Sequence, residues 1–193
     1  MILWIDTETG GLDEKINPVL TLGFAITDDE YNIIYKNELK VKNKHNLKCE
    51  DGALNVNRIN LINHDKVAKD PAEVALLFNR TIKKHFRGTP TIAGHNINFD
   101  LKFIKEMYIR EGLEFKSSRY LDTLQLFRFF ENWGLIKPES SKMDSLIKYF
   151  KIKSLGKKHS ALVDVINNIK IVKILKNLTQ VKDLEKYLKS IER

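Results

Sequence analysis

The amino-acid sequence predicts an α/β fold, a mixed β-sheet with helices on its faces. Three strand patterns come first, strand and helix patterns alternate through the middle of the chain, and helix patterns dominate the last third. The sequence contains no internal repeat, low-complexity linker or shift of composition that would divide it. We therefore expect residues 1–193 to form a single domain.

Strand patterns fill much of the first forty residues. Residues 2–6 are a short apolar run, typical of a buried strand. Residues 19–27 alternate with period 2, and residues 31–41 give a third candidate strand after an acidic turn at 28–30. Together they predict an antiparallel meander. One face of the second strand carries only small side chains, which predicts that a helix packs closely against it: Val19, Thr21, Gly23 and Ala25.

The remaining residues alternate between helix and strand patterns. Residues 42–70 are polar and suggest one short helix near 53–56. Asp70 and Pro71 are a typical N-cap and first residue of a helix, which we expect to end by Gly88. Two further strands are expected, over 89–93 and 119–121. A helix is expected over 98–112, and another begins after Asp122 as its N-cap. The last helices are expected over 143–150, 160–178 and 180–191.

The composition indicates a soluble globular protein. Hydrophobic residues make up 42% of the 193 residues and charged residues 30%, a balance that argues against disorder. No apolar run approaches the roughly 18 residues of a membrane span, so no membrane association is expected. The first residues lack the basic segment of a signal peptide. The single cysteine, Cys49, excludes an internal disulfide and favours a reducing, cytoplasmic setting.

Positive charge is concentrated in the second part of the chain. The formal net charge is +8, with 33 Lys and Arg against 25 Asp and Glu. Residues 1–119 contain 18 basic and 17 acidic side chains, whereas residues 120–193 contain 15 and 8. Most of the basic residues are lysines, which suit phosphate attraction better than base reading. Charge alone leaves nucleic-acid binding and a merely solvated basic surface equally open.

Two acids lie at the end of the first expected strand. Asp6 and Glu8 are two residues apart, so both side chains leave the same face, roughly 6.5–7 Å apart along the chain. Buried together they would repel each other unless a cation lay between them. Two acids at a solvated strand end are the commoner arrangement, so this pair by itself is only a candidate site.

Three further residues are candidates for the same chemistry. Asp100 follows the fourth expected strand, although acids also favour the first turn of any helix. Asp164 lies within a helix pattern, where aspartate has poor propensity. His159 lies at the entry to that helix, and a lone histidine is usually structural or simply exposed. Each residue is a weak signal alone, and their joint order is much stronger.

That order resembles the motif set of a known family. The segments are DTETGGL at 6–12, GHNINFD at 94–100 and HSALVD at 159–164, with LDTL at 121–124. They resemble the motifs of the DnaQ-like (DEDDh) 3′–5′ exonuclease family, and the resemblance extends over residues 2–177. It implies an RNase H-like fold, in which a five-stranded mixed sheet of three antiparallel and two parallel strands carries helices on both faces.

The resemblance also implies a site and a mechanism. Four carboxylates would hold two divalent cations, Mg²⁺ or Mn²⁺, and a histidine would be the general base: Asp6, Glu8, Asp100 and Asp164, with His159. Hard oxygen ligands suit these ions. Two such ions stabilise the attacking and leaving oxygens of an in-line displacement, and the products would be nucleoside 5′-monophosphates.

Further residues are implied to bind the substrate strand. The backbone at Thr9 and Gly10 would hold the terminal 3′-hydroxyl, and Leu12 would wedge against the terminal bases. Asn96 and Phe99 would line the pocket, although core packing explains Phe99 equally well. Two lysines leading into His159 would hold phosphates, unless they belong to an ordinary exposed loop: Lys157 and Lys158.

Three functions follow from these expectations. The first is a 3′–5′ exonuclease on single-stranded nucleic acid with a free 3′ end, with DNA as the expected substrate. The second applies the same chemistry to RNA, and the third is a non-enzymatic nucleic-acid-binding scaffold. A complete acidic set argues against the scaffold. A homodimer or a polymerase acting in trans are both possible partners.

Overall fold

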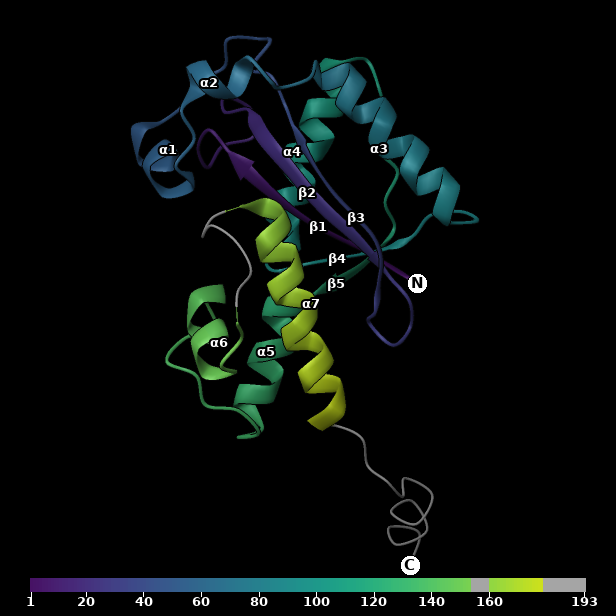
Figure 1. The fold of residues 1–193 in the computed structure, drawn as a ribbon, viewed down its shortest axis with the longest axis vertical. Helices are drawn as coiled ribbons and strands as arrows, with labels where there is room; N and C mark the ends of the chain where they lie inside the picture. The colour runs from purple at the N-terminus through teal and green to yellow at the C-terminus, as the bar shows by residue number, and fades with distance from the viewer. Residues whose placement is uncertain (154–159, 179–193) are drawn as a thin grey trace, which may run out of the picture.

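A computed structural model of the chain describes residues 1–153 and 160–178. Its centre is a five-stranded sheet in the order β3-β2-β1-β4-β5 (Figure 1). The strands are β1 (Ile2–Thr9), β2 (Val19–Thr27), β3 (Ile33–Lys40), β4 (Thr91–Gly94) and β5 (Arg119–Asp122). β1, β2 and β3 pair antiparallel, whereas β4 and β5 pair parallel to β1 and to each other. The predicted mixed sheet is confirmed.

Several strand boundaries differ from the prediction. β4 begins at Thr91 rather than at residue 89, where pairing with β1 and β5 starts, and β1 and β3 differ for local reasons. β1 continues beyond residue 6, because its polar residues still pair with β2 as far as Thr9 opposite Val19. β3 begins at Ile33 rather than at residue 31. Tyr31 has a left-handed φ of 59°, and the Asn32 N–H donates to Asp28 Oδ1 at 2.8 Å, so both residues belong to the turn.

Seven helices connect and cover the strands within the described residues. They are α1 (Asp51–Asn57), α2 (Leu61–Asp65), α3 (Pro71–His85), α4 (Ile97–Arg110), α5 (Thr123–Asn132), α6 (Met143–Tyr149) and α7 (Ala161–Leu178). The predicted N-caps of α3 and α5 are confirmed, since Asp70 and Asp122 accept from the N–H groups of Ala72 and Leu124. Residues 42–70 contain two short helices instead of one, and the helix expected over 180–191 lies outside the described residues.

The sheet separates two hydrophobic cores. Leu3 and Ile5 of β1 point to the face covered by α3 and α4, where Phe24 and Phe78 pack with ring centroids 4.8 Å apart. Trp4 points to the opposite face, which α5, α6 and α7 cover. Strand side chains alternate between faces, so Asp6 and Glu8 lie on the same face as Trp4.

α7 approaches the sheet over Thr21, Gly23 and Ala25 of β2, as predicted. Val19, expected on the same face, belongs instead to the opposite core, because the pairing of β1 and β2 shifts register between Glu8 and Thr9. α7 crosses in front of the strands in Figure 1, drawn in yellow-green. A Cβ atom on Gly23 would overlap the backbone of Ala161 and Leu162 at the start of α7. Glycine is therefore required there for the helix to lie so near the strand.

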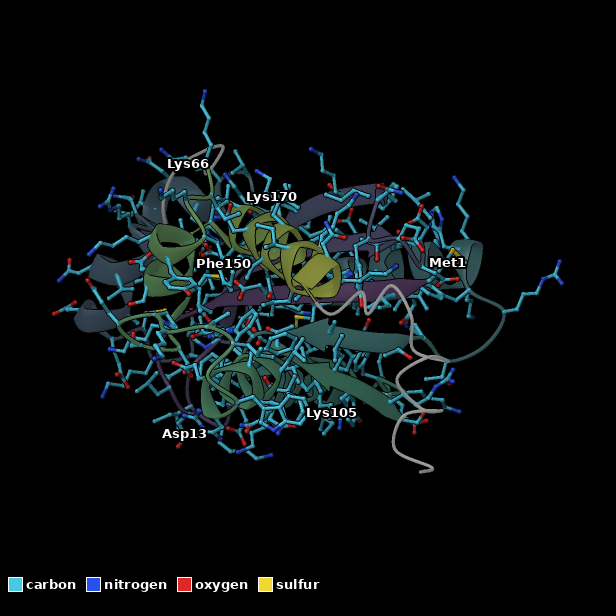
Figure 2. All side chains as sticks on the ribbon, turned by 90° about the horizontal axis from the view of Figure 1, so that it is seen from below. Met1, Asp13, Lys66, Lys105, Phe150 and Lys170 are labelled. Carbon is cyan, nitrogen blue, oxygen red and sulfur yellow. The ribbon has the colours of Figure 1, made fainter. Side chains whose placement is uncertain are left out.

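The C-terminal half of α7 is held by polar contacts as well as by packing. Lys173 Nζ donates to Asn32 Oδ1 at 2.7 Å, and Lys176 Nζ pairs with Glu30 at 2.7 Å in the β2–β3 turn. Lys170, labelled in Figure 2, donates to the carbonyl of Lys153 at 3.1 Å.

Among residues 1–153 and 160–178, no helix is long and apolar enough to cross a lipid bilayer.

Candidate active site

The C-terminal half of β1 supplies two acids to one face of the sheet. Asp6 pairs with Gly23 of β2, and Glu8 pairs with Thr21. Both acids therefore project beside the first turn of α7, where small residues on β2 leave room for the helix. The strand carries Thr7 between them, and its side chain points to the other face, toward α4.

Asp164 completes a group of three carboxylates. It lies in the first turn of α7, and its N–H donates to the carbonyl of Ser160 at 3.0 Å. One carboxylate oxygen from each of Asp6, Glu8 and Asp164 lies within 4.8 Å of the others. Residues far apart in the sequence thus lie together on the face of the sheet that α7 covers.

Asp100 reaches the same region from the other side of β1. Pairing between β1 and β4 stops at Trp4 and Ala93, so the edge of β1 beyond that point is open to α4. Asp100 Oδ1 accepts from both the N–H and the hydroxyl of Thr7, each at 2.8 Å. This carboxylate is 3% exposed and is held in one orientation by the strand that carries Asp6 and Glu8.

The grouped acids disturb one another's protonation. Burial first, and then the charges of Asp100 and Asp164, raise the pKa of Asp6 well above its usual range. The pKa of Glu8 rises to about 8, mainly through burial and the charge of Asp164. The pKa of Asp100 rises to about 7 through burial, although the two hydrogen bonds from Thr7 oppose the shift.

These shifts describe a site that is unstable when all of its acids are ionised. Bringing several carboxylates together away from water costs free energy unless protons or cations neutralise them. The donors are all carboxylate oxygens, which favour hard divalent cations such as Mg²⁺ and Mn²⁺. The residues present therefore fit a divalent metal site.

An open pocket of about 410 Å³ adjoins Glu8. It lies between the end of β1, α1 and the first turn of α4. Three predicted substrate residues line it: Thr9, Leu12 and Phe99. Leu12 is 80% exposed and stands at the rim. Phe99 lines the pocket and also packs on Phe103, with ring centroids 4.9 Å apart.

Two further predicted substrate residues are not among those that line the pocket. A Cβ atom on Gly10 would lie 2.6 Å from Pro18 Cδ and 2.9 Å from Cys49 Sγ, so packing also favours glycine there. Asn96 is exposed, has a left-handed φ of 62° and donates its N–H to Asp122 Oδ1 at the start of α4. Their contacts with a substrate stay predictions. His159, Lys157 and Lys158 lie outside the described residues.

A family comparison matches almost the whole described chain. The sequence profile of the RNase T exonuclease family matches residues 3–172, which include all four predicted carboxylates and His159. The chain belongs to this exonuclease family. The resemblance to DnaQ-like 3′–5′ exonucleases is thereby confirmed.

Individual relatives of the chain differ in length. A DNA polymerase III PolC-type protein of Latilactobacillus sakei is 36% identical over 99 residues, which cover 50% of the chain and 6% of that protein. An oligoribonuclease of Haemophilus ducreyi is 25% identical over 178 residues, covering 89% of the chain and 90% of that enzyme. The chain thus spans a small part of the PolC-type proteins but nearly all of the oligoribonuclease.

A structural comparison confirms the RNase H-like fold of the chain. E. coli exonuclease I, solved in complex with a dT13 oligonucleotide, superposes with a TM-score of 0.81 at 20% identity. The match covers 97% of this chain and 43% of exonuclease I. At this identity the superposition establishes the shared fold.

Several residues of the candidate site were not predicted from the sequence. Val56, which is 58% exposed, and Asn57 line the pocket from α1. Asn57 is buried and donates from Nδ2 to the carbonyl of Thr9 at 3.0 Å, which fixes the end of β1. Glu38 of β3 lies near enough to raise the pKa of both Asp6 and Glu8. These residues lie in segments without a recognised motif, so only their positions in space reveal them.

Proposed function

We propose that this protein is a metal-dependent 3′–5′ exonuclease that hydrolyses phosphodiester bonds at the 3′ ends of single-stranded nucleic acid, with DNA as its main substrate. The observation that carries the proposal is the meeting of carboxylate oxygens from Asp6, Glu8 and Asp164 within 4.8 Å, beside an open pocket. Membership of the exonuclease family supports it.

Two divalent cations would be held by the four carboxylates, Asp6, Glu8, Asp100 and Asp164. When bound, such ions stabilise the attacking and leaving oxygens of an in-line displacement and favour ionisation of a water molecule. The protein's own part is to keep the ligands in place. Asp6 and Glu8 are fixed by strand pairing, Asp164 by α7, and Asp100 by its two hydrogen bonds from Thr7.

His159 would act as the general base. An imidazole nitrogen of this residue would accept a proton from the attacking water, since its ordinary pKa near 6.5 suits proton transfer at neutral pH. The sequence places it five residues before Asp164, at the entry to α7. Lys157 and Lys158, immediately before it, would attract the phosphates of the substrate strand.

The pocket would take the terminal nucleotide. Leu12, Val56 and Phe99 give it apolar walls on which a base can pack, and stacking of this kind tolerates any base. The backbone at Thr9 and Gly10 would contact the 3′-hydroxyl, and Asn57 holds the Thr9 carbonyl in place. Products would be nucleoside 5′-monophosphates.

RNA is the second candidate substrate, and one observation favours it. The oligoribonuclease of Haemophilus ducreyi matches this chain over 90% of its own length, whereas the PolC-type protein does so over 6%. Against it stands the single-stranded DNA oligonucleotide bound in the structurally similar exonuclease I.

Two assemblies remain to be tested, a homodimer and a complex with a polymerase in trans. The mass of the protein in solution, alone and mixed with a polymerase, distinguishes them.

A gel assay tests the proposal and separates its substrates. Single-stranded DNA, duplex DNA, long RNA and di- to pentanucleotides, all 5′-labelled, would be incubated with the protein and Mg²⁺. We expect a ladder that shortens from the 3′ end of single-stranded DNA and disappears with EDTA. Preference for long RNA or short oligomers would instead support the RNA function. No cleavage of any substrate would contradict the proposal and favour the non-enzymatic scaffold.

A further inference from the structure

We infer that Glu38 is a positioning residue of the active site: its carboxylate anchors the first turn of α7 and thereby sets the position of Asp164 against Asp6 and Glu8. This inference rests on the proposed function. It concerns a residue of β3 that belongs to none of the sequence motifs and that reaches the site from the edge of the sheet.

Glu38 lies in line with Asp6 across three strands. Asp6 of β1 pairs with Gly23 of β2, and Gly23 pairs in turn with Glu38 of β3. Directly paired residues point to the same face of a sheet, so both acids project toward α7. The residue between them is glycine, and the backbone of Ala161 and Leu162 occupies the space that its side chain would fill.

The Glu38 carboxylate bonds directly to the start of α7. Its Oε2 accepts from the Ser160 hydroxyl at 2.9 Å and from the Leu162 N–H at 3.1 Å. A helix leaves its first N–H groups without partners, and an acceptor there usually comes from the residue just before the helix. Here an acid from a distant strand supplies that acceptor, and its negative charge also suits the helix N-terminus.

The consequence for Asp164 follows from helix geometry. Leu162 and Asp164 belong to the same first turn, and the Asp164 N–H bonds to the carbonyl of Ser160. The contact with Glu38 therefore holds the residues immediately around Asp164. Losing it would let the first turn shift or fray, and a displacement of about 1 Å at a catalytic group can cost on the order of 100-fold in rate.

Glu38 also lies close to the acidic cluster, because Asp6 and Glu38 both pair with Gly23 from opposite sides of β2. Direct ligation of a cation is the competing role for Glu38, and the charge-removing variant below separates the two.

Four variants test the inference. Glu38→Ala removes the acceptor, whereas Glu38→Gln removes the charge but keeps a carbonyl oxygen for the Leu162 N–H. Ser160→Ala removes one of the two donors. The matched control is Glu30→Ala, because Glu30 also joins the sheet to α7 but at the far end of the helix, through Lys176. For each variant one would measure kcat, KM, Mn²⁺ affinity and the thermal midpoint in EDTA.

We expect Glu38→Ala to lower kcat by about 10- to 100-fold with little change in KM, and to weaken Mn²⁺ binding. Glu38→Gln should recover most of both losses, Ser160→Ala should lose less than Glu38→Ala, and Glu30→Ala should match the wild type. Equal losses in Glu38→Gln and Glu38→Ala would overturn the inference in favour of a purely electrostatic or ligand role. A normal Glu38→Ala would overturn it outright.

The Mn²⁺ titration keeps this inference separate from the proposed function. If the wild type binds Mn²⁺ but cleaves no nucleic acid, the proposed function fails, and weaker Mn²⁺ binding by Glu38→Ala with recovery in Glu38→Gln still supports the positioning role. If Glu38→Ala binds Mn²⁺ as the wild type does, the positioning role fails whatever the substrate. Thermal midpoints in EDTA show whether Glu38→Ala is folded.

Discussion

The two halves of the interface between α7 and the sheet have opposite chemistry. Beyond the first turn, Val165 and Ile169 pack with Trp4 and Ala25 in a closed apolar core. At the first turn, Asp164 meets Asp6 and Glu8. The same helix and the same strands build both halves. The apolar half supplies the packing free energy that holds the acidic half together against its own repulsion.

This contrast explains why the acidic half can serve a reaction. Carboxylates that repel one another would separate if they lay on flexible loops. Here two are fixed on a strand and one on a helix that is packed along most of its length. Under the proposed function, the carboxylates are held in place before any cation binds, which is the arrangement that electrostatic catalysis requires.

The largest expected effect comes from changing the acidic half alone. Asp164→Asn keeps the shape of the side chain but removes its charge, so we expect activity to fall by about 10³-fold or more. The free energy of unfolding in EDTA should stay the same or increase, because repulsion is relieved. Rates and denaturation curves measure the two quantities. Near-normal activity would show that Asp164 is not a ligand.

Changing the apolar half should have the reverse result. Ile169 is 2% exposed in the core beneath α7, and Ile169→Ala should lower the free energy of unfolding by about 2–5 kcal/mol. The rate per folded molecule, measured well below the thermal midpoint, should remain close to that of the wild type. A large loss of activity in a fully folded variant would show that the two halves are not separable.

The glycine between the two halves should affect both. A side chain on Gly23 would overlap the backbone of Leu162, so Gly23→Ala should cost about 1–3 kcal/mol of stability and also displace Asp164. We expect lower activity and a lower thermal midpoint together. The stability control is Gly52→Ala, where a Cβ atom would meet nothing within 4 Å. Unchanged activity in Gly23→Ala would contradict the close approach of α7.

A smaller effect concerns pH in the absence of metal. Because the pKa of Glu8 is raised to about 8 from an ordinary value of 4.5, the folded protein keeps a proton that the unfolded chain releases between these values. The free energy of unfolding in EDTA should therefore fall as pH rises through this window and level off above about pH 8. Added Mg²⁺ should stabilise more at high pH than at low pH.

Denaturant titrations in EDTA at several pH values measure this slope. Asp164→Asn should reduce the total fall and end it at a lower pH, since the charge of Asp164 is the largest contribution to the Glu8 shift after burial. A free energy of unfolding that rises with pH over the same window would contradict the raised pKa.

Much of this fold could be predicted because local patterns and long-range packing agree. The alternation of β2 predicted both its strand and its small-residue face, and Gly23 shows why that face is small. The acids of β1 and α7 were found through their motifs. Asp70 and Asp122 marked their helices through capping alone.

Other parts of the site could not be predicted, for physical reasons. Glu38 acts through a helix more than a hundred residues away, and no local pattern encodes that contact. Asn57 lies at the end of a short helix in a polar segment, where its buried bond to Thr9 leaves no periodic signal. The motif drew attention to the Gly10 backbone as a substrate contact, but no local pattern showed that packing against Pro18 also favours glycine at this position.

The most direct test of the central claim is a Mn²⁺ titration at pH 7.5, in which electron paramagnetic resonance measures the free and bound ion. The proteins compared are the wild type, Asp6→Asn, Asp164→Asn and the control Asp29→Asn. The claim is that the acids held between β1 and α7 bind the catalytic cations. It predicts that the wild type binds two Mn²⁺ ions and that either variant loses at least one, while Asp29→Asn, an exposed acid of the β2–β3 turn, binds as the wild type does. Equal Mn²⁺ binding by all four proteins, or none by the wild type, would contradict it.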